Sequence, residues 1–74
     1  MVSCNLVREG RTIASDVSFP QVPSKGDVIA NADPKKEHYL VLRVEYVIGF
    51  ENVNLHVKEF PNQLACVNNV DGFR

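Results

Sequence analysis

The fold is decided by residues 39–60, which read YLVLRVEYVIGFENVNLHVKEF. Alternate positions in the first half are apolar, as in a strand with one buried face: Leu40, Leu42, Val44, Tyr46 and Ile48. The sequence Gly49-Phe50-Glu51-Asn52 predicts a turn, after which residues 53–60 return as a second strand. Placing Ile48 opposite Val53, Tyr46 opposite Leu55 and Val44 opposite Val57 turns both apolar sets to one face. Residues 39–48 and 53–60 therefore predict the antiparallel hairpin at the core of the domain.

A second hairpin is predicted nearer the N-terminus, from residues 2–8 and 11–17. Glu9-Gly10 separates the two strands and suits a tight turn. This turn places Leu6 opposite Ile13, Cys4 opposite Ser15 and Val2 opposite Val17, with Phe19 extending the same row. The opposite face is small or polar, and Val7 is the one residue that does not fit it.

Shorter features fill the rest of the chain. Pro20 and Pro23 interrupt any ladder. A type I turn that Val22 opens has Pro23 at its second position, with Gly26 available for a positive φ. Residues 27–30 predict a short strand, residues 31–37 a polar loop and residues 64–67 a last short strand, followed by an unassigned tail at 70–74. Without a helix to cover its apolar face, such a sheet is expected to curl. We therefore predict one all-β domain over residues 1–74, a small SH3-like or related partly open β-barrel of about five to six antiparallel strands.

The run Val22-Pro23-Ser24-Lys25-Gly26-Asp27 carries a resemblance, together with the later positions Tyr39, Val41 and Val44. It resembles small bacterial and phage proteins of the SH3-like barrel type, in which such a turn opens a strand and a Tyr-x-Val-x-x-Val motif begins the central hairpin. The likeness covers residues 22–58 and implies a fold without implying a catalytic residue.

The composition limits the classes of partner. The 74 residues carry eight basic and nine acidic side chains, for a formal charge of −1, so no strongly basic field attracts phosphate. Uncharged stretches are shorter than the roughly 20 apolar residues of a membrane helix, and no secretory signal is expected. We expect a cytoplasmic protein that does not bind membranes. Cys4 and Cys66 are then expected to remain thiols, Cys4 as a small buried hydrophobe.

No set of residues has the spacing of a catalytic or metal site. The two histidines, His38 and His56, are far apart, and no Cys-x-x-Cys pair is present. The hairpin register makes His56 a cross-strand partner of Glu45, and His38 is expected to be solvated at the start of its strand. We therefore expect no enzymatic activity, no cofactor and no bound metal.

Protein interaction is the function that the sequence favours, with self-association as the expected form. The hairpin register turns one apolar set outward, and a turn adds an exposed aromatic: Tyr39, Val41, Val47, Phe50 and Phe60. A thin core also favours burial of further apolar surface against a second copy or another protein. The competing interpretation is that the first hairpin packs over this face and makes it part of the core.

Binding of single-stranded nucleic acid is the alternative function. Small barrels bind single strands through basic grooves with aromatic side chains on which bases stack. The basic candidates are Lys35, Lys36, Arg43 and Lys58, with Tyr39 and Phe60 as stacking residues. Glutamates at 37, 45 and 59 lie in the same region and weaken this prediction.

Overall fold

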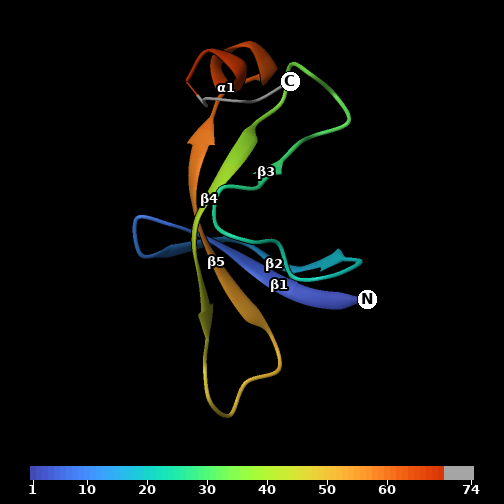
Figure 1. Ribbon diagram of the computed structural model, residues 1–74, viewed down its shortest axis with the longest axis vertical. Coiled ribbons are helices and arrows are strands. Elements are labelled where there is room, and N and C mark those ends of the chain that lie inside the picture. Colours follow the sequence, from blue (N-terminus) through green and yellow to red (C-terminus); the bar gives the residue numbers. More distant parts are fainter. Residues whose placement is uncertain (70–74) are drawn as a thin grey trace.

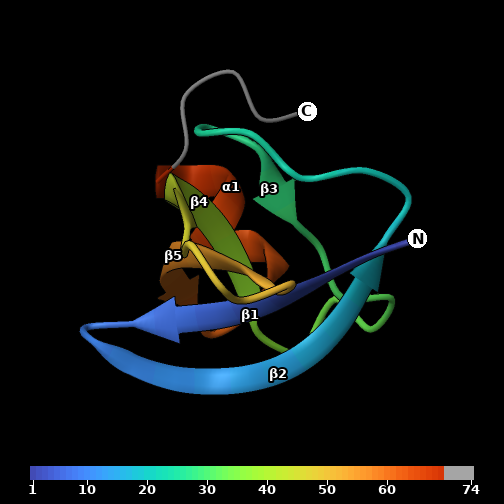
Figure 2. The same ribbon diagram turned by 90° about the horizontal axis from the view of Figure 1, so that it is seen from below.

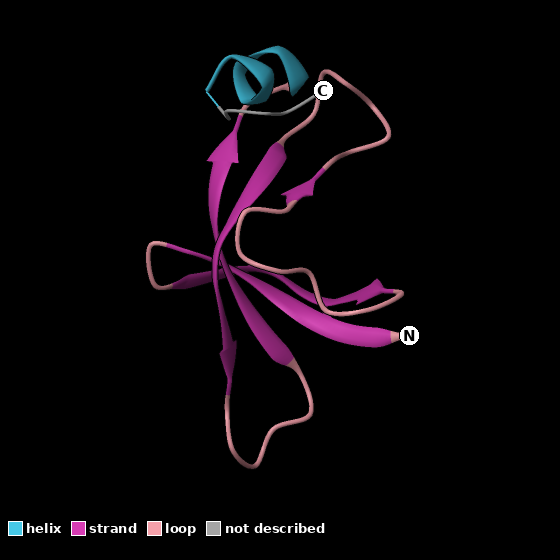
Figure 3. Ribbon diagram, in the orientation of Figure 1, coloured by secondary structure: helices cyan, strands magenta, loops and turns pink. Residues whose placement is uncertain are grey.

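The computed structural model describes residues 1–69 as a five-stranded sheet with one short helix (Figure 1). The elements in chain order are β1 (Val2–Arg8), β2 (Arg11–Phe19), β3 (Val28–Ile29), β4 (His38–Tyr46), β5 (Val53–Phe60) and α1 (Gln63–Asn69). The strands are ordered β2-β1-β5-β4-β3 across the sheet. Figure 3 shows α1 beyond one end of the strands rather than across the middle of the sheet.

The sheet curls into a half-barrel, which confirms the predicted all-β, partly open barrel. The β1–β2 hairpin runs across the long, twisted β4–β5 hairpin, and β2 bends strongly (Figure 2). One part of the prediction was wrong, because the strands are not all antiparallel. β1 pairs with β5 in parallel, Cys4–Val7 against Val53–His56, and this ladder joins the two hairpins.

The first hairpin has the predicted turn and, beyond it, a different register. Glu9 and Gly10 have φ values of 51° and 79°, and both lie in the left-handed region that a tight hairpin turn of this type requires. Arg8 pairs with Arg11 as predicted, but two irregularities then shift the ladder. At the second one Asp16 also has a positive φ, 55°.

These bulges replace the predicted partners. Leu6 lies opposite Ala14 rather than Ile13, Cys4 opposite Val17 rather than Ser15, and Val2 opposite Phe19 rather than Val17. The apolar pairs are thereby kept on the core side, and the bulges add the bend that curls β2.

In the second hairpin β4 ends two residues earlier than predicted, at Tyr46, and the ladder contains a bulge at Leu42. Tyr46, not Ile48, lies opposite Val53, and Val44 lies opposite Leu55 rather than Val57. The ladder then slips between Val41 and Arg43, so that Val41 lies opposite Val57. Because side chains alternate along a strand, this extra residue moves Val41 from the predicted outer face to the core face.

The segment before β3 is held against β4 at the bulge. The Ser24 carbonyl accepts a hydrogen bond from the Asp27 amide at 2.9 Å, and Gly26 has a φ of 92°, so the turn opens at Ser24, two positions later than predicted. The Gly26 amide donates to the Val41 carbonyl at 2.8 Å, and the Val41 amide donates to the Asp27 carbonyl at 2.9 Å. The turn therefore covers the Val41 side of β4.

The core lies inside the curl. Its buried side chains come from β1, β4 and β5, and side chains of β2 and β3 pack around them. The central cluster consists of Cys4, Leu6, Val41, Val53, Leu55 and Val57. Cys4 is the small buried hydrophobe that was predicted, and both cysteines are free thiols. Burial raises the pKa of the Cys4 and Cys66 thiols, which favours the unreactive protonated form.

The C-terminal element is a helix, so the prediction of a short strand at 64–67 was wrong. Asn62 begins it as an N-cap, its Oδ1 accepting a hydrogen bond from the Ala65 amide at 2.8 Å. The Gln63 amide donates to the Pro34 carbonyl at 2.8 Å, and Cys66 is buried. The predicted tail at 70–74 lies outside the described residues.

Candidate functional site

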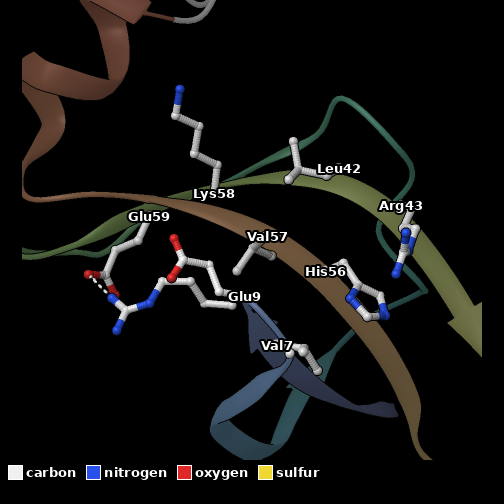
Figure 4. Close-up of a pocket in the computed structure, with 10 residues that line it drawn as sticks. Val7, Glu9, Leu42, Arg43, His56, Val57, Lys58 and Glu59 are labelled. Atoms are coloured by element: carbon white, nitrogen blue, oxygen red, sulfur yellow. Dashed lines mark hydrogen bonds and ion pairs between the residues drawn. The ribbon is translucent and has the colours of Figure 1, made fainter.

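A groove opens where β1 and β5 diverge beyond their last pair, Val7 with His56. It has a volume of about 710 Å³, and its apolar part includes the buried residues Val7 and Val57 (Figure 4). Arg8 from β1 forms an ion pair with Glu59 from β5 across the gap. The burial of Val7, which did not fit the predicted alternation, is explained by its position at this junction.

The charges in this groove are mixed. Arg43 and His56 lie together at one end, whereas Lys58 extends away from Val7 (Figure 4). The Lys58 ammonium lies 5.5 Å from the centre of the Phe60 ring, a cation–π distance. Glu9 and Glu59 also line the groove, so it does not present a concentrated positive field.

The predicted nucleic-acid residues are brought together only in part. Arg43 and Lys58 line the same groove, but Lys35 lines a separate one beside the start of α1. Lys36 lies in the same loop, where its amide donates to the Asp33 carbonyl at 3.0 Å.

The predicted outward face of β4 is only partly at the surface. Val41 and Phe60 are 1% and 4% exposed, so their placement on an outward face was wrong. The bulge at Leu42 turns Val41 inward, and Phe60 pairs with His38 at the end of the hairpin next to α1. Tyr39 and Val47 are half-buried, Tyr39 against the core, and burial raises the pKa of the Tyr39 hydroxyl.

His38 is also buried, contrary to the expectation that it is solvated. Its Nδ1 lies 2.9 Å from the Lys36 carbonyl, which can only accept, so Nδ1 carries the proton and donates. This bond fixes the end of the loop to the first residue of β4. His38 is therefore a structural residue of the β3–β4 connection.

Three exposed apolar side chains lie near the end of the β4–β5 hairpin. Tyr46, Ile48 and Phe50 are 70%, 101% and 75% exposed, and we call these three residues the hairpin tip. Phe50 is exposed at the turn, as the sequence predicted. Tyr46 and Ile48 were missed as surface residues because their alternation with Val44 assigned them to the core face. The turn of the β4–β5 hairpin projects beyond β1 and β2 (Figure 1), and Tyr46 is the last residue of β4 before this turn.

A chain of polar side chains crosses the outer face of the sheet. Asn52 Nδ2 donates to Asp16 Oδ1 at 2.6 Å and to Asn5 Oδ1 at 3.2 Å, and Asn5 Nδ2 donates to Asn54 Oδ1 at 3.1 Å. Asn54 Nδ2 in turn donates to Glu45 Oε1 at 3.1 Å. These bonds connect β2, β1, β5 and β4 and anchor the Asp16 bulge. This network could not be predicted from local patterns, because its members are far apart in the sequence.

Glu45 is the last member of this network. It also contacts His56 on the neighbouring strand, and this cross-strand contact was predicted from the sequence. His56 Nε2 donates to Glu45 Oε1 at 3.0 Å although the two residues are diagonal, not directly opposite, neighbours. The hydrogen bonds from His56 and Asn54 lower the pKa of the Glu45 carboxyl. A lowered pKa means that this carboxylate stabilises the fold above its ordinary titration range and loses that effect as the pH falls through the lowered pKa.

Among residues 1–69, no three His, Cys, Asp or Glu side chains are grouped so that they could hold a metal ion. In the same described range, no helix has the length and apolar character needed to span a membrane. Comparisons with protein-family models, curated proteins and solved structures gave no match to this chain.

Proposed function

We propose that this protein is a non-enzymatic interaction module that self-associates through the hairpin tip. The observation that carries the proposal is the exposure of Tyr46, Ile48 and Phe50 together at the end of one hairpin. Large exposed apolar and aromatic side chains are frequent anchors of association surfaces. Burying one such side chain contributes about 1.5–3 kcal/mol, which offsets part of the entropic cost of association.

The position of the hairpin tip also suits binding. It lies at the end of a long hairpin whose other half is held by β3 and α1, so a partner can approach without disturbing the core. The mixed charges of the surrounding surface keep the chain soluble while leaving the apolar contacts to determine affinity.

Replacing both Ile48 and Phe50 by aspartate should abolish self-association. Two charges would then have to be buried without partners in the contact, which is strongly unfavourable. The folded chain should keep its circular dichroism spectrum and melting temperature, because both side chains are exposed. Sedimentation velocity over a concentration series measures the association.

Leu64→Asp is the matched control, because Leu64 is an exposed apolar residue on α1, outside the hairpin tip. Leu64→Asp should leave association unchanged. Equal loss of association in the control and the tip variant, or unchanged association in the tip variant, would contradict the proposal.

A second candidate function, binding of single-stranded nucleic acid, is favoured by one observation. Arg43 and Lys58 line the same groove, together with His56. The burial of Phe60 and the partial burial of Tyr39 count against it, because bases need exposed rings for stacking.

Fluorescence anisotropy with short single-stranded oligonucleotides at low salt tests this candidate. Binding that is lost in the Arg43→Ala, Lys58→Ala double variant would support it. Phosphate contacts are strongest at low salt, so the absence of binding there would dismiss it.

A further inference from the structure

Within the described residues, the edge of β4 that faces away from β5 has no neighbouring strand beyond Val41. β3 pairs with Tyr39 and Leu40, and the turn before it bonds the backbone of Val41. Within residues 1–69, no backbone hydrogen bond joins the outer side of residues 42–46 to another segment. We call this open side of residues 42–46 the β4 edge.

The ladder shows which backbone groups face this edge. The N–H and C=O of Val41 bond to Asp27 and Gly26, so they point away from β5. Successive pairs of an antiparallel ladder alternate in direction, and Arg43 with His56 is the next pair, followed by Val44 with Leu55. The backbone groups of Val44, and two residues later those of Tyr46, therefore face the open edge. Such groups are a template for another strand.

We propose that two copies of this chain pair their β4 edges antiparallel, about a two-fold axis at Val44. This proposal deepens the proposed function and rests on it, because the same hairpin carries the tip. In this register Val44 bonds the partner's Val44, Arg43 lies opposite the partner's Glu45, and Leu42 lies opposite the partner's Tyr46. The contact is isologous, so it closes after two copies.

Charge complementarity selects this register. Arg43 and Glu45 are both exposed and lie on the same face of β4, one on each side of Val44. The axis at Val44 therefore creates two opposite-charge cross-strand pairs, each favourable by about 0.2–1 kcal/mol. An axis at Glu45 would place two glutamates opposite each other, and an axis at Tyr46 would leave both charges unmatched.

The Glu45 carboxylate keeps one oxygen for the partner. Both of its hydrogen bonds, from His56 and from Asn54, go to Oε1. Among the described residues, none donates a hydrogen bond to Oε2. The network that positions Glu45 thus leaves Oε2 to accept from the partner's Arg43.

A groove beside the β4 edge receives the partner's hairpin tip. It has a volume of about 350 Å³ and lies between the segment before β3 and the strand, with Val22 and Pro23 on one side and Val44 and Tyr46 on the other. The chain that follows the partner's Tyr46 passes Leu42 and reaches this groove. The partner's Ile48, fully exposed in the single chain, is buried there against Val22 and Pro23.

A charge exchange on the full chain tests the register. Arg43→Glu and Glu45→Arg, each alone, should raise the dimer dissociation constant about tenfold or more, because each creates two like-charge pairs. The double variant Arg43→Glu, Glu45→Arg restores two opposite-charge pairs and should bind within a few-fold of the unchanged chain. Sedimentation velocity measures the constants, and circular dichroism verifies that each variant is folded.

Glu9→Arg and Arg11→Glu are the matched controls, since both residues are exposed at the β1–β2 turn and make the same changes of charge. Both controls should leave the dissociation constant unchanged. Amide hydrogen exchange adds a backbone measurement, because the Val44 and Tyr46 amides should become protected as the protein concentration rises.

The outcomes separate this proposal from the proposed function. If the double variant is as weak as the single variants, or the Val44 and Tyr46 amides stay unprotected in the dimer, edge pairing is overturned. If the Ile48→Asp, Phe50→Asp variant loses association while both single charge changes leave it intact, docking through the hairpin tip stands and edge pairing fails. A chain that is monomeric at every concentration overturns both.

Discussion

Val41→Lys is expected to leave the chain unfolded at room temperature. Val41 is 1% exposed within the central cluster, and its backbone is bonded on the side of the Gly26–Asp27 turn. A lysine there would bury an ammonium group without a partner, at a cost of several kcal/mol or more. A 74-residue domain has a total stability of only about 4–11 kcal/mol, which this cost approaches or exceeds. The far-ultraviolet circular dichroism spectrum should lose its strand signal.

Leu42→Lys is the control, because Leu42 is the neighbouring residue and is exposed. It should change the free energy of unfolding by less than about 0.5 kcal/mol. The two variants together test the bulge, since a regular strand in the predicted register would bury Leu42 and expose Val41. A folded Val41→Lys chain together with an unfolded Leu42→Lys chain would contradict the observed register.

Leu55→Ala should lower the free energy of unfolding by about 2–5 kcal/mol, as other large-to-small core substitutions do. Leu55 is fully buried in the middle of β5, between Leu6 on β1 and Val44 on β4. The cavity left by its removal therefore adjoins both hairpins and cannot close without moving one of them. Urea denaturation followed by circular dichroism measures the change.

Leu64→Ala gives the comparison for this second prediction, because it removes the same atoms from an exposed site on α1. Its effect should be within about 0.5 kcal/mol. A loss below about 1 kcal/mol for Leu55→Ala would mean that β5 is not at the centre of the core.

The hairpins could be predicted from alternation because each buries one face, but the slips in their registers could not. The bulge at Leu42 is selected by the docking of the Gly26–Asp27 turn on Val41, a contact between distant segments. The positive φ of Asp16 likewise depends on Asn5 and Asn52, which hydrogen-bond to it from other parts of the chain. Local sequence patterns cannot predict such contacts between distant segments.

The helix was missed for a different reason. Residues 63–69 are few, and β-branched Val67 and the asparagines have low helix propensity. What the sequence did contain was the N-cap, since Asn62 follows Pro61 directly before the helix. The burial of Cys66 against the sheet then stabilises an element whose intrinsic propensity is weak.

Residues of the candidate site were predicted correctly only where their exposure does not depend on the pairing register of the strands. Phe50 is exposed because it lies in a turn, and a turn remains at the surface when the ladder slips. The predicted exposure of Val41 and Phe60 depended on which face of the sheet each side chain occupies. A single extra residue in β4 moved Val41 to the core face. Arg43 and Glu45 lie beyond the bulge and stayed on the outer face.

The parallel pairing of β1 with β5 imposes an order on synthesis and folding. Each hairpin joins segments close in the sequence, but Cys4–Val7 must wait for Val53–His56. Closing a loop of this length carries a large entropic cost before any contact compensates for it, so the docking of the two hairpins is the slow step. Until β5 leaves the ribosome, the apolar side of the first hairpin is open to water. That hairpin is therefore the part of the nascent chain most exposed to chaperones and to aggregation.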